Sequence, residues 1–86
     1  MCYTYILRSK KDNHLYTGCT NDLRKRFNQH MAGRVYPTKA RGPFEVVYYE
    51  ACIEKADAFA REKYLKSGNG KRYVKNRLKR FLTLTG

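Results

Sequence analysis

YTY at residues 3–5, YTG at residues 16–18 and NDLRKRFNQH at residues 21–30 are the three segments that decide the fold. Either aromatic segment alone is typical of a β-strand, and the decapeptide alone is typical of a basic amphipathic helix. Their order and spacing carry more information. They bring two phenols, a guanidinium and an imidazole within reach of one small site.

The two aromatic segments predict a β-hairpin. Tyr3, Tyr5 and Leu7 alternate along the chain with a second set of residues, Thr4, Ile6 and Arg8. This alternation predicts a strand with one face on a core. The polar residues 10–13 are typical of a turn, and residues 15–17 return as a second strand.

The decapeptide predicts a helix. Apolar residues recur at every fourth position from Leu23 to Met31. Thr20 or Asn21 is the expected cap at its start, and Gly33 is expected to end it.

Two polar side chains lie at unusual positions on this helix. With each residue advancing about 100° around the axis, His30 falls in the apolar stripe that starts at Leu23, and Arg26 falls on its edge. Lys25 and Gln29 point well away from the core and are interpreted as solubilising residues.

The rest of the chain predicts one more strand and two more helices. A long loop at residues 34–43 precedes a Val- and Tyr-rich strand from Phe44 to Ala51. A helix is expected from about Lys55 to Lys66, followed by a break at residues 67–70. After the break, a last amphipathic helix is marked by the apolar residues Val74, Leu78, Phe81 and Leu82. The predicted class is α/β of the α+β type: a three-stranded antiparallel β-sheet flanked by three helices, in the order ββαβαα.

Composition limits the partners. Nineteen Lys and Arg residues against seven Asp and Glu residues give the 86-residue chain a net charge of +12, so polyanions, nucleic acid foremost, are the expected partners. The length predicts a single domain, residues 1–86. No segment resembles a membrane span or an export signal, and Cys2, Cys19 and Cys52 are expected as reduced thiols, so the chain is expected in the cytoplasm.

Basic side chains gather in the 34–43 loop and on the outer face of the last predicted helix. Loops of this length often contact ligands, and surface cations of this kind bind phosphates. A solvated basic surface is an equally good interpretation of any single one. The candidate phosphate contacts are Arg34, Lys39, Arg41, Lys71, Lys75 and Lys79.

Glu62 stands beside apolar neighbours on the second predicted helix. Ala58 and Leu65 flank it on the helical wheel, and an opposite apolar stripe leaves open which side faces the sheet. An inward-facing carboxylate needs a cation or a metal as its partner. An outward-facing one is expected to form a surface ion pair with Lys66 or Lys63.

These residue types suit phosphodiester hydrolysis. Such a reaction needs a base for water, a cation for the charge on the phosphorus and relief for the leaving oxygen. Tyr5 or Tyr16 is the candidate base if cations and a metal lower the phenol pKa. Arg26 is the candidate phosphate clamp, and Glu62 is the candidate ligand of one Mg²⁺.

From Tyr3 to Lys75 the chain resembles the GIY-YIG nuclease superfamily, in particular small stand-alone proteins similar to the N-terminal domain of the excision-repair subunit UvrC. YTY at residues 3–5 stands where the family has Gly-Ile-Tyr, and YTG at residues 16–18 stands where it has Tyr-Ile-Gly. Residues 21–30 resemble the family's arginine helix, and residues 58–66 resemble its glutamate-bearing helix.

The resemblance implies a role for each of five residues. Tyr5 is the implied general base or water-positioning phenol, and Tyr16 lines the same pocket. Arg26 is implied to stabilise phosphoryl charge, and His30 to assist proton transfer or orient Tyr5. Glu62 is the implied sole protein ligand of one divalent ion, Mg²⁺ or Mn²⁺.

Four positions depart from the family pattern. Tyr3 replaces a glycine and Thr17 an isoleucine of the two motifs, while the tyrosines assigned to chemistry remain. Cys19 stands where UvrC-like domains often carry a lysine that helps to lower the phenol pKa. The family's late asparagine has Asn76 as a weak candidate.

Two hypotheses about function follow. The first is a metal-dependent endonuclease that hydrolyses DNA at a structure rather than a sequence, in repair or processing. The second is a nucleic-acid-binding module that keeps the fold but cleaves slowly or not at all, which the missing lysine at position 19 supports. RNA in place of DNA is a weaker alternative, because nothing in the pattern reads base edges or a 2′-hydroxyl.

Overall fold

The centre of the molecule is a three-stranded antiparallel sheet. The computed structural model describes residues 1–85, so Gly86, the end of the expected domain, lies outside the described residues. Strands β1 (Cys2–Ser9), β2 (Leu15–Thr20) and β3 (Phe44–Cys52) are arranged in the order β2-β1-β3. The predicted hairpin joins β1 to β2, which leaves β2 at one edge of the sheet.

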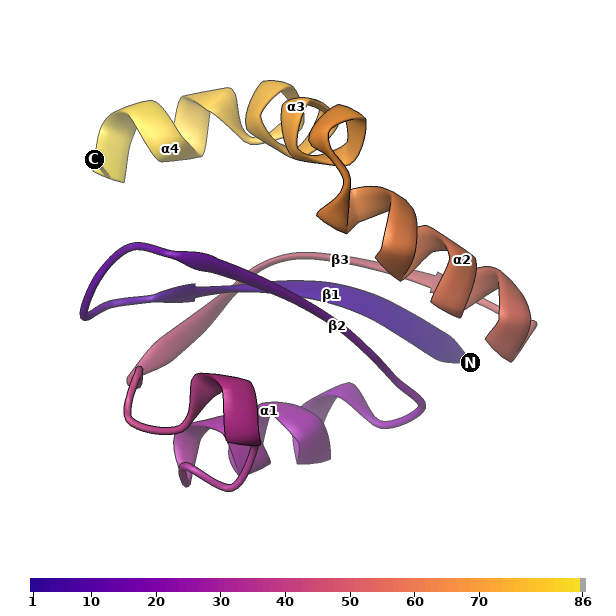
Figure 1. Ribbon diagram of the computed structural model, residues 1–86, viewed down its shortest axis with the longest axis horizontal. Coiled ribbons are helices and arrows are strands. Elements are labelled where there is room, and N and C mark those ends of the chain that lie inside the picture. The colour runs from indigo at the N-terminus through magenta and orange to yellow at the C-terminus, as the bar shows by residue number, and fades with distance from the viewer. Residues whose placement is uncertain (86) are drawn as a thin grey trace.

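Helices cover both faces of this sheet. Helix α1 (Leu23–Met31) lies on one face, and α2 (Lys55–Lys66), α3 (Gly68–Arg77) and α4 (Lys79–Thr85) lie on the other (Figure 1). A short 3₁₀ helix, η1 (Tyr36–Thr38), interrupts the loop before β3. The predicted α+β class and the order of its strands and helices are confirmed.

The central strand β1 is buried on both faces rather than on the single face that alternation predicted. On one face Tyr5 packs with Phe44 in a cluster that α1 helps to cover. On the other face Ile6 packs with Leu65 and Val74, which belong to α2 and α3. The difference arises because a middle strand between two helical layers has no solvent-facing side.

The start of α1 differs by one or two residues from the expectation. Asp22 caps the helix, since its side chain accepts a hydrogen bond from the Lys25 amide at 3.1 Å. The predicted caps Thr20 and Asn21 are therefore wrong, although the Thr20 hydroxyl accepts from the Asp22 amide at 3.1 Å. An aspartate at this position also complements the positive end of the helix dipole.

The last predicted helix is two helices, and the break before it is shorter than expected. Ser67 alone separates α2 from α3, and its hydroxyl accepts from the Gly70 amide at 3.1 Å as an N-cap. A β carbon on Gly70 would overlap the Tyr64 carbonyl oxygen, so the absence of a side chain at Gly70 allows a tight corner instead of a loop. Leu78 then separates α3 from α4.

Two further features concern the thiols and the length of the helices. Cys2, Cys19 and Cys52 are all free and half-buried. Within residues 1–85, no helix is long and apolar enough to cross a membrane.

Candidate active site

Tyr5 reaches the site by passing over Gly18. The two residues are partners across the β1–β2 ladder, and Tyr5 is only 2% exposed. A β carbon on residue 18 would overlap the phenol oxygen and ring of Tyr5. Glycine is required there because a side chain would occupy the volume of the phenol. The first aromatic segment thus supplies the phenol, and the glycine of the second segment leaves the space that the phenol occupies.

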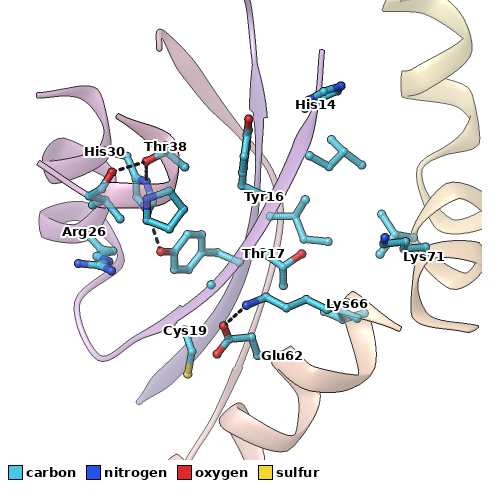
Figure 2. A pocket seen from close by; sticks show the side chains of 18 of the residues that line it. His14, Tyr16, Thr17, Cys19, Arg26, His30, Thr38, Glu62, Lys66 and Lys71 are labelled. Atoms are coloured by element: carbon cyan, nitrogen blue, oxygen red, sulfur yellow. Dashed lines mark hydrogen bonds and ion pairs between the residues drawn. The ribbon is translucent and has the colours of Figure 1, made fainter. Parts of the chain in front are cut away.

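His30 holds the phenol of Tyr5 from the direction of α1. Its Nε2 lies 2.8 Å from the Tyr5 hydroxyl, and its Nδ1 lies 2.7 Å from Thr38 Oγ1 (Figure 2). His30 is 5% exposed, which confirms its predicted place in the apolar stripe. Burial, followed by the positive charge of Arg26, lowers the pKa of His30 to about 4. The imidazole is therefore neutral at pH 7.

The phenol of Tyr5 keeps its proton in this environment. Burial raises the pKa of Tyr5 above its usual value of 10.0, and a hydrogen bond and the charge from Arg26 offset part of that increase. The protein's own cations therefore do not by themselves lower the pKa of Tyr5, and the condition set for a phenolate base, cations together with a metal, is met here by Arg26 only in part. Desolvation outweighs them because removing the phenol from water disfavours the phenolate.

Arg26 offers an unused donor beside the phenol. Its Nη1 donates to Gln29 Oε1 at 3.2 Å, while its buried Nε has no hydrogen-bond partner among the described residues. A buried donor without a partner is unfavourable, and the planar guanidinium matches the oxygens of a phosphate. The arrangement fits an anion that is itself a hydrogen-bond acceptor.

Glu62 belongs to α2 and approaches β2 near Cys19 (Figure 2). Helix α2 lies on the opposite face of the sheet from α1 (Figure 1). Ala58 and Leu65 are 0% and 2% exposed, so this side of α2 faces the sheet, which answers the question left open by the helical wheel. The Glu62 side chain is 19% exposed, and its Oε2 lies 2.8 Å from Lys66 Nζ. The expected ion pair with Lys66 is present even though Glu62 faces a groove.

A groove of about 900 Å³ runs along β2 and brings the predicted residues together. It opens to both helical layers, because β2 is the edge strand. Tyr16 lines this groove and also packs edge-on against Phe44, with ring centroids 5.9 Å apart. All five predicted catalytic side chains line it: Tyr5, Tyr16, Arg26, His30 and Glu62.

The predicted phosphate contacts divide into two groups. Lys71 and Lys75 of α3 line the groove, and Figure 2 shows Lys71 across it from β2. Arg41 instead forms an ion pair with Asp12 at 3.3 Å. The remaining candidates are exposed and are not among the described residues that line the groove: Arg34, Lys39 and Lys79.

Thr38 is a residue of the groove that the sequence did not predict. This residue is 2% exposed, lines the groove and contacts His30. It lies in η1, where no periodicity marks a functional side chain, so the contact with α1 becomes visible in three dimensions alone. Asn76, the candidate for the family's late asparagine, is exposed on α3 and is not among the groove residues.

The donor set fits one hydrated divalent ion rather than a cage of protein ligands. Within residues 1–85, no group of three or more His, Cys, Asp or Glu side chains could hold a metal ion. Glu62 supplies the one carboxylate among the described residues that line the groove. Mg²⁺ typically takes one or two carboxylates and completes its shell with water and substrate phosphate, which a single glutamate facing an open groove allows.

Comparison with known protein families identifies the class to which this fold and this site belong. The sequence matches the GIY-YIG catalytic domain over residues 1–80, and the chain belongs to the GIY-YIG family. The resemblance inferred from the two aromatic segments is therefore confirmed. Membership indicates the nuclease superfamily.

The individual relatives are small proteins of one group. The chain is 47% identical to a UPF0213 protein from Clostridium perfringens over 68 residues, which cover 77% of this chain and 71% of the relative. It is 45% identical to a UPF0213 protein from Oceanobacillus iheyensis over 65 residues, 74% of either chain. The solution NMR structure of a UPF0213 protein from Bacillus halodurans shares 32% identity with a TM-score of 0.49, covering 100% of this chain and 87% of that one.

Proposed function

We propose that this chain is a metal-dependent endonuclease that hydrolyses phosphodiester bonds in DNA. The observation that carries the proposal is the meeting of Tyr5, Arg26 and Glu62 in one groove. These side chains supply the kinds of group that hydrolysis needs: a proton acceptor, a phosphate clamp and a ligand for a divalent ion.

Arg26 binds the scissile phosphate in this proposal. Its unpartnered Nε and its remaining donors point to an anion of phosphate geometry. As negative charge grows on the phosphate oxygens during attack, a guanidinium already in place stabilises it without reorganisation. The binding of a phosphate also offsets the charge of Arg26 that helps to lower the pKa of His30, which makes the imidazole a better proton acceptor once substrate is bound.

Tyr5 and His30 act on the attacking water. The Tyr5 oxygen takes a proton from water as the phenol proton moves across the 2.8 Å contact to His30 Nε2. No free phenolate is then required, which suits a phenol whose pKa is raised by burial. Tyr16 shapes the adjacent wall of the groove.

Glu62 holds one Mg²⁺ or Mn²⁺ in the proposal. When bound, such an ion supplies positive charge at the scissile phosphate and at the leaving oxygen. Lys66 competes with it for Glu62 Oε2, so the state of this ion pair regulates how readily the carboxylate is available.

The surrounding cations favour DNA as the substrate and its shape as the recognised feature. Lys71 and Lys75 line the groove, and such side chains contact the phosphate backbone, which carries no direct sequence information. We therefore propose cleavage at DNA structures, in repair or processing in the cytoplasm. RNA shares the phosphate chemistry and is an outcome that the assay must separate.

A second candidate function is a nucleic-acid-binding module with weak or no cleavage. The specific observation in its favour is that Lys66 occupies Glu62 Oε2 while Cys19 lines the groove where relatives of the UvrC type carry a lysine. This module would bind DNA with a strong salt dependence and leave it intact in every metal.

The Arg26→Ala variant tests the proposal, with Lys25→Ala as the matched control from the exposed face of the same helix. Nicking of plasmid and of branched, flapped and single-stranded DNA and RNA is measured with Mg²⁺, Mn²⁺ or chelator. We expect Arg26→Ala to lose roughly 100-fold or more in rate while Lys25→Ala stays near the wild type. Equal rates for the two variants would contradict the proposal.

A further inference from the structure

A chain of three hydrogen bonds runs from the proposed base into the protein interior. Tyr5 contacts His30 Nε2 at 2.8 Å, and His30 Nδ1 contacts Thr38 Oγ1 at 2.7 Å. The Thr38 hydroxyl in turn lies 3.3 Å from the Val35 carbonyl oxygen. All these side chains are buried, so their hydrogen bonds are not shared with bulk water.

The direction of each bond follows from the end of the chain. The Val35 carbonyl can only accept, so the single hydroxyl proton of Thr38 is donated to it. Oγ1 must then accept from His30, which places the imidazole proton on Nδ1. Because the ring is neutral, Nε2 carries no proton and accepts the hydroxyl proton of Tyr5.

The local backbone holds Thr38 in this position. Thr38 ends η1, and its amide donates to the Val35 carbonyl at 3.1 Å. Its own carbonyl accepts from the Arg41 amide at 3.0 Å, so the residue is fixed on both sides of its side chain. Pro37 restricts the preceding backbone further.

We propose that Thr38 is a positioning residue, which fixes the tautomer of His30 so that Tyr5 gives its proton to the imidazole and turns a lone pair toward the attacking water. This inference rests on the proposed nuclease function. In the opposite tautomer Nε2 would donate to the phenol oxygen, and His30 could not accept the phenol proton.

The proton balance of the step is complete. A water O–H bond breaks as the water oxygen bonds to phosphorus, and its proton moves to the Tyr5 oxygen. The original phenol proton moves to His30 Nε2, which gives an imidazolium with protons on both nitrogens. The bond from phosphorus to the leaving oxygen breaks, the leaving oxygen takes a proton from solvent, and His30 returns one to solvent.

The test compares Thr38→Val, which keeps the branched shape without the hydroxyl, with Thr38→Ser, which keeps the hydroxyl. Nitrogen-15 NMR of histidine-labelled protein, without DNA or metal, reports which imidazole nitrogen carries the proton. The signals of His14, whose side chain is 71% exposed, serve as an internal comparison. We expect the Nδ1–H tautomer in the wild type and in Thr38→Ser, and its loss in Thr38→Val.

Cleavage kinetics provide the second measurement. We expect Thr38→Val to lower kcat about 100-fold with KM for DNA unchanged, and Thr38→Ser to restore kcat. An Nε2–H tautomer in the wild type, or a wild-type tautomer in Thr38→Val, overturns the positioning role. If Thr38→Val does not fold, the wild-type and Thr38→Ser spectra decide the tautomer alone. A wild-type protein that cleaves nothing in any metal overturns the nuclease function instead, and the spectra distinguish the two failures.

Discussion

Tyr5 and Gly18 face each other across the β1–β2 ladder, and the phenol of Tyr5 lies where a β carbon on residue 18 would stand. This relationship explains why the two aromatic segments must occur together. The first supplies the phenol, and the second supplies the space through which it reaches the groove at the sheet edge.

Gly18→Ala should therefore lose both stability and activity. The added methyl group forces the ring of Tyr5 aside, at a cost of about 1–3 kcal/mol in the free energy of unfolding. Gly68→Ala is the matched control, because no heavy atom lies within 4 Å of the added β carbon. We expect its free energy of unfolding to lie within about 1 kcal/mol of the wild-type value. Urea titrations of both variants measure this, and equal stabilities would contradict the close approach.

The buried imidazole predicts a loss of stability in acid. The pKa of His30 is about 4 in the folded chain, against 6.5 for an ordinary histidine, so between these values the unfolded chain binds the proton and the folded chain does not. The free energy of unfolding is therefore fully retained above pH 6.5 and falls as pH decreases toward 4, by about 3 kcal/mol. The difference between wild type and His30→Gln across this range isolates the effect, and parallel profiles would contradict it.

The ion pair of Lys66 predicts how readily the proposed metal site at Glu62 takes up an ion. The Lys66 ammonium lies 2.8 Å from Glu62 Oε2, so it repels a cation that binds the same carboxylate. Lys66→Ala should therefore bind Mn²⁺ about fivefold more tightly, which corresponds to removing a repulsion of about 1 kcal/mol between the two positive charges in water. Lys63→Ala, an exposed neighbour on the same helix, removes the same charge without freeing Glu62. Calorimetry without DNA compares the two, and an equal gain in both would show that Lys66 does not compete for the carboxylate.

Lys71 and Lys75 should matter more for DNA than Lys79. The first two line the groove, whereas Lys79 does not. Each of Lys71→Ala and Lys75→Ala should weaken binding and reduce the slope of log K against log salt concentration by about 1. Lys79→Ala should keep the wild-type slope. The reverse order would place the DNA path elsewhere on the molecule.

The hairpin and α2 could be predicted from sequence because the signals are local. Alternation and a polar turn mark β1 and β2, and the predicted bounds of α2 agree with Lys55–Lys66. His30 was also placed correctly, since a helical wheel needs only the period of the helix and one apolar stripe.

What the sequence did not predict depends on contacts between distant segments. Asp22 is one of several adjacent polar residues, and the cap is identified by two hydrogen bonds in three dimensions: its side chain accepts from the Lys25 amide, and its own amide donates to the Thr20 hydroxyl. Burial of both faces of β1 depends on helices far along the chain. Thr38 meets His30 through the fold of the intervening loop, and the raised pKa of Tyr5 follows from desolvation, which no pattern of charges reveals.

The central claim is that Glu62 makes this groove a metal-dependent nuclease site. Nicking of plasmid and of branched DNA by the wild type, Glu62→Gln and the matched exposed control Glu54→Gln tests it most directly, with Mg²⁺, Mn²⁺ or chelator. We predict metal-dependent cleavage by the wild type and Glu54→Gln, and its loss in Glu62→Gln with the fold and DNA binding retained. Cleavage that persists in Glu62→Gln, or a wild type that binds DNA but never cuts it, would contradict the claim.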